Sequence, residues 1–359
     1  MSVVVPCYNY AHFLPDAVSS VLTQTGVEIE LIVVDDASTD SSAMIVEALS
    51  KVDARARLIR HSRNRGPVET FNDGLAAITG EFVVRLDADD MLTPGSLSRS
   101  VDLARAFPTV GLVYGHPIHF FESSDPKESL RGWGRPVTVA PGSRAPFRSR
   151  VHSWTVWPGR RWLADRCRTG LNVITSPEVL MRASVVDRVG GQKSLAHTHD
   201  MEMWLRLSAV SDVAHIEGAD QAWHREHPNS LSRDLSDPVH EIRERHAAFE
   251  MFFAGIGGEL AEADHLHDLA SRALARATLR YAAHECDRGR CDTTSIVALR
   301  DCAIDFYPGA AELPAWRSLR RRERVQSSWP WRISPLAGAA VLRRLEYELF
   351  LTRWMRWGV

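Results

Sequence analysis

GEFVVRLDADDMLTP, residues 80–94, joins a short apolar run to three carboxylates. Residues 82–86 have the length and apolar character of a buried central strand. In open α/β sheets the ligand crevice lies outside the carboxyl ends of the strands. The stretch therefore predicts a central strand that delivers Asp87, Asp89 and Asp90 to a ligand at the edge of a sheet.

The spacing of two of these carboxylates favours a cation site. Asp87 and Asp89 project the same way from an extended backbone, so both can approach one ion. Mg²⁺ and Mn²⁺ prefer oxygen ligands, and proteins commonly hold them with carboxylates together with substrate phosphates. Taken alone, an Asp-x-Asp pair fits an acidic turn after a strand equally well, because short motifs match by chance.

Strands and helices alternate on both sides of this stretch. Further strands are predicted at residues 2–5, 29–34 and 58–59. Apolar residues at helical spacing indicate the helices between them, namely Leu14, Val18, Val21 and Leu22, then Met44, Ile45 and Leu49, then Phe71, Leu75 and Ile78. Thr93 and Pro94 predict the start of the next helix, with Thr93 as N-cap. The alternation favours parallel βαβ units with right-handed crossovers.

The overall composition excludes several classes of protein. The chain has 359 residues, which fits one large or two modest domains, and it is 45% hydrophobic and 25% charged, as globular proteins are. The net charge of -2 gives no indication of a nucleic acid partner. Met1 leads directly into an apolar strand, and no apolar run approaches membrane-spanning length. We therefore expect a cytoplasmic protein without a signal peptide.

The cysteines support the same expectation. They are scattered and form no Cys-x-x-Cys pair: Cys7, Cys167, Cys286, Cys291 and Cys302. This pattern predicts reduced thiols in a cytoplasmic compartment, and it argues against a disulfide framework or a zinc site.

A second acidic strand end follows residues 29–34. Asp36 is placed to accept a hydrogen bond from the ring N–H of uracil or thymine, which adenine cannot donate from its ring. The alternative is that Asp36 caps the next helix, although Asp40 competes better for that role. Two acidic strand ends at one edge of a sheet can serve one nucleotide.

Four motifs in this order and spacing resemble the family 2 glycosyltransferases of the GT-A fold. They are VVVPCYN (3–9), SVLTQT (20–25), VVDDASTD (33–40) and LDADD (86–90). The resemblance covers residues 1–115 and returns over residues 172–232. It implies an α/β domain of GT-A type, Rossmann-like, with a mostly parallel sheet and flanking helices. It also implies inverting transfer of a sugar from a nucleotide-sugar donor.

Carried over to this sequence, the resemblance implies roles for individual residues of the donor half. Pro6 and Tyr8 are expected beside the nucleotide base, and Asp36 on the base. Asp87 and Asp89 are expected at the ribose, the diphosphate and a bound Mn²⁺ or Mg²⁺, with Asp89 as the metal ligand.

The acceptor half contains the block HTHDMEMWLRL, residues 197–207. It is similar to the family's Glu-Asp pair before a helix of the form x-x-x-Trp-Leu-Arg, which implies that Asp200 is the base that deprotonates the acceptor hydroxyl. His199 stands where the family commonly has Glu. Simple capping of the helix by Asp200 is the alternative. A zinc site at His197 and His199 is disfavoured, because no Cys or third His is near in sequence.

The segment WHREHPNSLS, residues 223–232, resembles the family's Tyr-Arg-x-His segment, which closes over the donor. The resemblance implies that His227 is a metal ligand and that Arg225 contacts the diphosphate. A surface His-Pro turn without a ligand is the alternative. An inverting displacement needs one carboxylate near the attacking hydroxyl and a cation on the leaving diphosphate, so the whole set suits that reaction.

Two basic regions carry no clear assignment. Residues 127–168 interleave arginines with tryptophans, which indicates either a solvated excursion or an acceptor-side loop for an anionic group such as a lipid phosphate. At the C-terminus, arginines accompany aromatic residues at helical spacing, namely Tyr347, Phe350, Trp354 and Trp357. This pattern fits peripheral membrane contact, and it fits docking onto the catalytic domain equally well.

Together these patterns predict a GT-A domain at residues 1–235, with a nucleotide-sugar half at 1–115 and an acceptor half at 116–235. A helical C-terminal extension is expected at residues 236–359. The predicted activity is metal-dependent sugar transfer from a UDP- or dTDP-sugar to a hydroxyl acceptor, with a lipid- or phosphate-linked glycan among the candidates. The expected location is cytoplasmic, at the inner face of the membrane if the C-terminal segment binds there.

Two other functions stay open from the sequence alone. A nucleotide-sugar-binding partner subunit would lack transferase activity, and it would have no need of a base such as Asp200. A nucleotidyltransferase would be expected to carry a glycine-rich, basic phosphate loop after its first strand, and residues 6–10 have neither feature.

Overall fold

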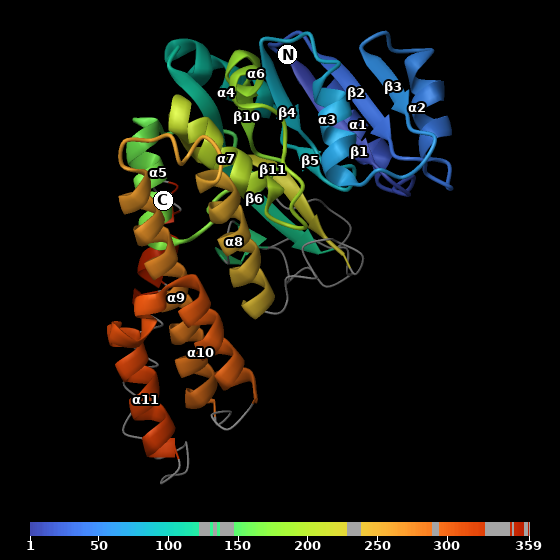
Figure 1. Ribbon diagram of the computed structural model, residues 1–359. Coiled ribbons are helices and arrows are strands. Elements are labelled where there is room, and N and C mark those ends of the chain that lie inside the picture. The colour runs from blue at the N-terminus through green and yellow to red at the C-terminus, as the bar shows by residue number, and fades with distance from the viewer. Residues whose placement is uncertain are drawn as a thin grey trace.

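One mostly parallel sheet organises the first two thirds of the chain, with strands in the order β3-β2-β1-β4-β10-β6-β11-β5 (Figure 1). The computed structural model describes residues 1–121, 130–131, 135–136, 147–227, 238–288, 294–326, 345–346, 348–354 and 358. The strands of this path are β1 (Ser2–Cys7), β2 (Glu30–Asp35), β3 (Ala56–Arg60), β4 (Phe82–Arg85), β5 (Met91–Leu92), β6 (Val110–Phe121), β10 (Leu180–Arg182) and β11 (Asp212–Glu226).

The direction of the strands confirms the predicted fold class. β1 to β4 run parallel to one another, and β6 runs parallel to β11. The short β10 lies between these two groups and is antiparallel to both β4 and β6. Off this path, β9 (Ser153–Trp157) pairs with β11, β7 (Leu130–Arg131) pairs with β6, and β8 (Arg135–Pro136) pairs with β7.

Helices cover both faces of the sheet, which explains why the strands are continuously apolar. The donor-half helices are α1 (Leu14–Leu22), α2 (Ser42–Ser50), α3 (Pro67–Leu75) and α4 (Ser96–Ala106). Along β1, Val3 and Val5 belong to the same core as Leu14, whereas Val4 belongs to the opposite core with Phe71. This alternation places one buried side chain of β1 on each face in turn.

Two local predictions in this half are wrong. The helix after the carboxylates does not begin at Thr93 and Pro94, because Met91–Leu92 forms β5 and pairs with β11. The Thr93 hydroxyl donates instead to the carbonyl oxygen of Asp220 at 2.6 Å, and Gly95, with a φ of 75°, is the N-cap of α4. In α2, Met44 is exposed, and the helix buries other residues, including Val46.

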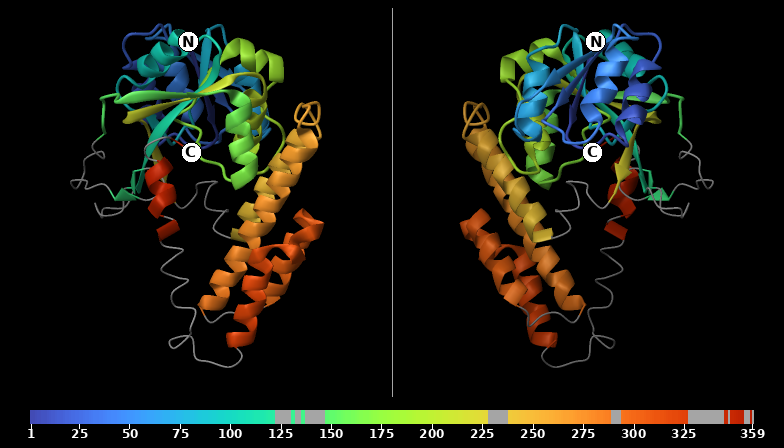
Figure 2. Two further views of the ribbon diagram at one scale, coloured as in Figure 1. Left: turned by 90° about the vertical axis from the view of Figure 1, so that its left-hand side faces the viewer. Right: turned by 90° about the vertical axis from the view of Figure 1, so that its right-hand side faces the viewer.

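The C-terminal third is helical, as predicted, and projects away from the sheet (Figures 1 and 2). Its helices are α8 (Pro238–Phe253), α9 (Ala263–Asp287), α10 (Thr294–Phe306) and α11 (Pro314–Gln326), with a 3₁₀ helix at Pro308–Glu312. They share one hydrophobic cluster with α5 (Gly159–Thr169) and α7 (His199–Val210) of the first part. The predicted boundary at residues 235 and 236 lies outside the described residues.

The described C-terminal residues return to the sheet domain (Figure 2). Trp354 is buried, and its indole N–H donates to the carbonyl oxygen of Val173 at 2.9 Å. The Tyr114 hydroxyl donates to the carbonyl oxygen of Gly358 at 2.6 Å. Trp354 therefore docks onto the domain. Two other aromatic residues of the predicted C-terminal stripe, Tyr347 and Trp357, lie outside the described residues.

The prediction of reduced thiols holds for Cys7, Cys167 and Cys302 and is wrong for Cys286, which is disulfide-bonded. Cys286 stands in the last turn of α9, and Cys291 lies outside the described residues. Among the described residues, no helix is both long enough and apolar enough to cross a membrane.

Candidate active site

The two acidic strand ends lie at the same edge of the sheet. β1 separates β2 from β4, and all three strands run in the same direction. Asp36 follows β2, and Asp87, Asp89 and Asp90 follow β4. The loop after β1, which carries Tyr8, lies between them in the strand order. The structure thus gathers the predicted donor residues at the carboxyl ends of three parallel strands.

Asp36 is an ionised and well-anchored carboxylate. It accepts hydrogen bonds from the backbone N–H groups of Arg65 at 2.8 Å and Gly66 at 2.9 Å, and it pairs with His61 Nδ1 at 2.8 Å. Burial acts to raise the pKa of Asp36, but these hydrogen bonds outweigh it and hold that pKa below its usual value. Asp36 therefore anchors the chain just before α3, and its contact with a base stays a prediction.

The loops after β1 and β2 are hydrogen-bonded to each other, and each contains a residue in a left-handed backbone conformation. Asn9 and Ala37 both have a φ of 59°, a left-handed conformation that residues other than glycine rarely adopt. The Asn9 side-chain oxygen accepts a hydrogen bond from the Thr39 N–H at 2.8 Å, so the loop after β1 is tied to the loop after β2. Pro6 is buried within β1, whereas Tyr8 is 45% exposed and leaves its ring open to a ligand.

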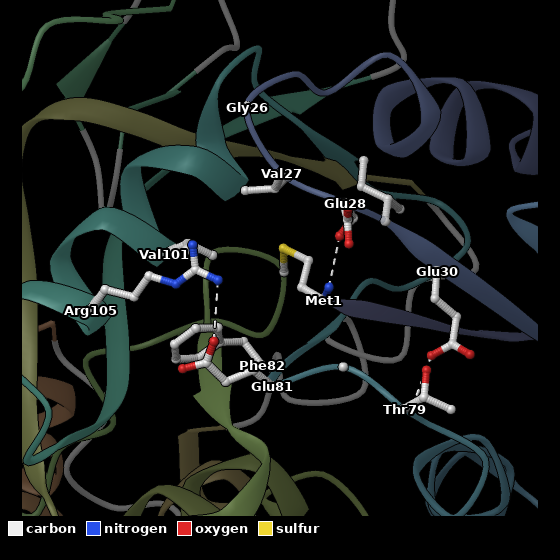
Figure 3. A pocket seen from close by; sticks show the side chains of 12 residues that line it. Met1, Gly26, Val27, Glu28, Glu30, Thr79, Glu81, Phe82, Val101 and Arg105 are labelled. Carbon is white, nitrogen blue, oxygen red and sulfur yellow. Dashed lines mark hydrogen bonds and ion pairs between the residues drawn. The ribbon is translucent and has the colours of Figure 1, made fainter.

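A small cavity of about 410 Å³ borders this anchored region. It is lined by Ala37 and Ser38 after β2 and by residues 60–62 at the end of β3. His61 joins the cavity to Asp36 through the pair described above. A second cavity, of about 570 Å³, lies at the amino ends of the strands, next to Met1, Glu28 and Glu81 (Figure 3). It is far from the carboxylates along the strands, so we do not assign it to the site.

Asp87 is held by a buried arginine that sequence reasoning missed. Arg85, in β4, donates from Nε to Asp87 Oδ1 at 2.9 Å and from a terminal nitrogen to the Gln192 side-chain oxygen at 2.7 Å. It links the donor carboxylates to the segment before α7. The available signal was a lone arginine in an otherwise apolar strand, two residues before the first carboxylate.

The structure brings Asp89 and His227 together across 138 positions of sequence. His227 Nε2 lies 2.9 Å from Asp89 Oδ2, and both side chains are largely buried. The two residues that the resemblance implied as metal ligands are therefore neighbours.

Arg225 supports this pair. Its Nε donates to the Asp89 carbonyl oxygen at 2.8 Å, and its guanidinium pairs with Asp16 at 3.2 Å and lies over the ring of Phe13. These contacts fix the backbone of Asp89. Contact between Arg225 and a diphosphate stays a prediction.

The buried Asp90, which follows Asp89 in the sequence, pairs with the partly exposed His224. His224 Nδ1 lies 3.0 Å from Asp90 Oδ2, and the other Asp90 oxygen accepts the Arg225 N–H at 2.8 Å. Burial acts to lower the pKa of His224, but Asp90 and Glu226 outweigh it and raise this pKa to about 10. His224 is therefore a cation at neutral pH in the metal-free protein.

Asp200 stands in the first turn of α7, within the electrostatic reach of Asp87. Its Oδ1 accepts the Met201 N–H at 2.6 Å, and Thr198 rather than Asp200 occupies the N-cap position. Burial raises the pKa of Asp200 to about 6, with smaller and opposite effects from Arg85 and Asp87. Such a carboxylate is ionised at pH 7 and basic enough to accept a proton.

A buried ion pair holds α7 in place. Arg206 donates to both oxygens of Glu202, one turn before it, and its terminal nitrogens donate to the carbonyl oxygens of Val189, Gly190 and Gly191. Helix α6 (Ala183–Val189) ends there. Arg206, the arginine of the block at 197–207, thus ties the helix that carries Asp200 to the end of α6.

His197 and His199, the pair considered above for zinc, flank Thr198 just before Asp200. Burial lowers the pKa of His199 to about 3, so this imidazole is neutral. Among the described residues, neither His197 nor His199 belongs to a group of three converging metal-ligand side chains.

Comparison with known sequences identifies relatives of this chain. Residues 2–164 match the sequence profile described as "Glycosyl transferase family 2". The chain is 42% identical over 103 residues to the succinoglycan biosynthesis protein ExoO of Rhizobium meliloti, which covers 29% of each protein. It is 38% identical over 125 residues to the uncharacterized glycosyltransferase alr2836 of Nostoc, covering 35% of this chain and 38% of that protein. The match therefore spans less than two fifths of either relative's length.

Comparison with solved structures gives the same type of fold. The crystal structure of residues 1–349 of S. aureus TarS, in complex with UDP-GlcNAc, superposes with a TM-score of 0.57 at 16% identity. The superposition covers 88% of this chain and 91% of that one. TarS is a GT-A-like glycosyltransferase, so the similarity confirms the GT-A fold.

Proposed function

We propose that this chain, whose residues 2–164 match the family 2 glycosyltransferases, transfers a sugar from a UDP- or dTDP-sugar to an acceptor hydroxyl with inversion at the anomeric carbon. One observation carries the proposal. Asp200 of α7 lies within the electrostatic reach of Arg85 and Asp87 at the end of β4, and Arg85 links Asp87 to Gln192 in the segment before α7. An inverting transferase needs these two functions side by side, one at the leaving diphosphate and one at the attacking hydroxyl.

Mn²⁺ or Mg²⁺ fits the residues at the leaving-group side. Two ligands in neighbouring positions of an octahedral ion, at about 2.1 Å from it, are about 3 Å apart. The 2.9 Å between Asp89 Oδ2 and His227 Nε2 agrees with that separation. Asp89 and His227 would hold the ion, which would supply positive charge for the departing diphosphate.

Asp200 acts as the general base in this proposal. Its carboxylate takes the proton from the acceptor hydroxyl while that oxygen attacks the anomeric carbon and the bond to the diphosphate breaks. Positive charge develops on the sugar ring in such a transition state. Arg85 orients Asp87, and the Glu202–Arg206 pair fixes the first turn of α7, so both sides of the reaction are held on rigid elements.

The nucleotide base is proposed to lie between Tyr8 and Asp36. The exposed ring of Tyr8 offers a stacking surface, and the buried Pro6 precedes it in β1. Asp36 Oδ2 accepts one backbone hydrogen bond, from the N–H of Gly66. A carboxylate oxygen can accept a second hydrogen bond. The ring N–H of uracil or thymine would donate that second bond.

A panel of nucleotides tests both the function and the base contact. We expect UDP or dTDP to bind most tightly in calorimetry with Mn²⁺, GDP less tightly and ADP least, because adenine has no ring N–H for Asp36. Nucleotide release should follow the same order for the corresponding sugar donors, and UDP-GlcNAc, which TarS binds, is the first to try. If ADP binds as tightly as UDP, the role of Asp36 is wrong. If no nucleotide-sugar is bound or turned over, the whole proposal fails.

This panel also separates the two other functions. A binding partner subunit would retain UDP without releasing nucleotide from any sugar donor. A nucleotidyltransferase would release diphosphate from a nucleoside triphosphate and a sugar phosphate. The acceptor is proposed only as a hydroxyl compound, with lipid- or phosphate-linked glycans as candidates. Peripheral membrane contact remains a proposal, for which the exposed Leu345 and Leu349 near the C-terminus are the available surface.

A further inference from the structure

Three side chains that the proposed transfer reaction does not use converge at the ends of β6 and β11. The two strands are parallel neighbours, and their register places His224 directly beside His119. Glu226 follows two residues later and so projects from the same face of β11. A ligand atom from each residue lies within 4.8 Å of those of the other two.

The distances within this cluster suit one small cation. His119 Nδ1 lies 3.0 Å from Glu226 Oε1, and His224 Nε2 lies 3.7 Å from the same oxygen. Ligands at about 2.0 Å from a tetrahedral zinc ion are about 3.3 Å apart, which falls between the two observed separations. Two imidazoles and one carboxylate form a donor set that binds zinc in proteins.

A carboxylate already orients the central histidine of this cluster. Asp90 is buried and sits 3.0 Å from His224 Nδ1. Metal-binding histidines almost always donate their second ring nitrogen to such a group, which fixes the ring and points the other nitrogen at the metal. With Nδ1 engaged by Asp90, the His224 atom that faces Glu226 is Nε2.

We propose that His119, His224 and Glu226 form a second metal site, which takes a divalent cation of the zinc class and is separate from the Asp89–His227 pair. His119 is buried, whereas the His224 and Glu226 side chains are 20% and 24% exposed, so an ion can enter from solvent. The bound ion joins the ends of β6 and β11 beside Asp90, next to the proposed donor site.

The test is a zinc titration of the untagged full chain after removal of metal with a chelator, in saturating Mg²⁺ to occupy the donor site. We expect one Zn²⁺ per chain by calorimetry. Binding should persist in Asp89→Asn and weaken at least about 100-fold in Glu226→Gln and in His119→Gln. None of these readouts requires sugar transfer, so the result is independent of the proposed reaction.

The chain supplies a matched control on its helices. Glu250 lies 3.5 Å from His246 Nε2 and accepts a hydrogen bond from His267 at 2.6 Å, which gives the same residue types without three converging ligands. The variant Glu250→Gln should bind Zn²⁺ as the wild type does. Loss of zinc in this control would show binding to surface histidines and would overturn the proposal.

Co²⁺ provides a second measurement on the wild-type chain, which does not depend on how a variant folds. A four-coordinate histidine–carboxylate site gives bound Co²⁺ intense visible absorption, whereas an octahedral site gives weak bands. We expect the intense spectrum in the wild type and in Asp89→Asn. Weak bands, or zinc binding that Asp89→Asn abolishes while Glu226→Gln leaves it intact, would place the ion at the donor site and contradict the proposal.

Discussion

The variant Asp200→Asn is expected to transfer sugar roughly 10²–10⁴-fold more slowly than the wild type, because general-base catalysis contributes about that factor. Asparagine keeps the size of the side chain, and its side-chain oxygen can still accept the Met201 N–H. Folding and UDP affinity should therefore stay close to wild type. Initial rates at saturating donor and acceptor, together with a UDP titration, measure the two effects separately.

The pH profile of the wild type is the control for this assignment. Burial raises the pKa of Asp200 to about 6, and only the ionised form can accept a proton. The transfer rate should therefore be level above that pH and fall about tenfold per pH unit below it. If Asp200→Asn transfers sugar at nearly the wild-type rate, Asp200 is not the general base and only accepts a hydrogen bond in the first turn of α7. The neighbours could not easily replace it, since Glu202 is paired with Arg206 and the pKa of His199 is about 3.

The variant Arg206→Met is expected to lower the free energy of unfolding by about 3–5 kcal/mol, which is the usual cost of removing one partner of a buried ion pair. Arg206 and Glu202 are almost fully buried and lie 2.8 Å apart. The substitution leaves Glu202 without its counter-charge and also leaves the carbonyl oxygens of residues 189–191 without their donor. Urea denaturation monitored by circular dichroism measures the loss.

An exposed ion pair with the same spacing provides the comparison. Arg272 and Asp268 also lie four residues apart on one helix, with 2.7 Å between their charged groups, but both side chains are about half exposed. Arg272→Met should cost less than about 1 kcal/mol, as exposed pairs do. Equal effects of the two substitutions would show that the Glu202–Arg206 pair is not what holds α7.

Sequence patterns predicted the donor half of the fold well, because its strands and the residues that follow them are recognised from short stretches of sequence. Buried parallel strands are continuously apolar, and residues that follow them reach one edge of the sheet. Only the family resemblance predicted that Asp89 and His227, which are 138 positions apart, act together. No local sequence pattern indicates that the end of β11 lies beside the end of β4. Periodicity likewise failed at Met44, because an amphipathic pattern in a short helix does not determine which face is buried.

The interactions missed by the sequence depend on packing between distant elements. Thr93 was expected to cap a helix. Its hydroxyl donates instead to the carbonyl oxygen of Asp220, because β5 pairs with β11 and brings the two residues together. Arg85 gave only the signal of a charge in an apolar strand, and nothing in the sequence indicated Gln192 as its partner.

The most direct test of the donor site at the strand ends is UDP binding in the presence and absence of Mn²⁺, compared between wild type and Asp89→Asn by calorimetry. We expect Mn²⁺ to strengthen UDP binding by the wild type, and Asp89→Asn to lose at least about tenfold in affinity with Mn²⁺, or about 1.4 kcal/mol. Metal-free UDP affinity should hardly change, and Asp53→Asn, in the loop between α2 and β3, should behave as the wild type. Equal affinities of wild type and Asp89→Asn for UDP with Mn²⁺ would contradict the metal site and, with it, the proposed donor geometry.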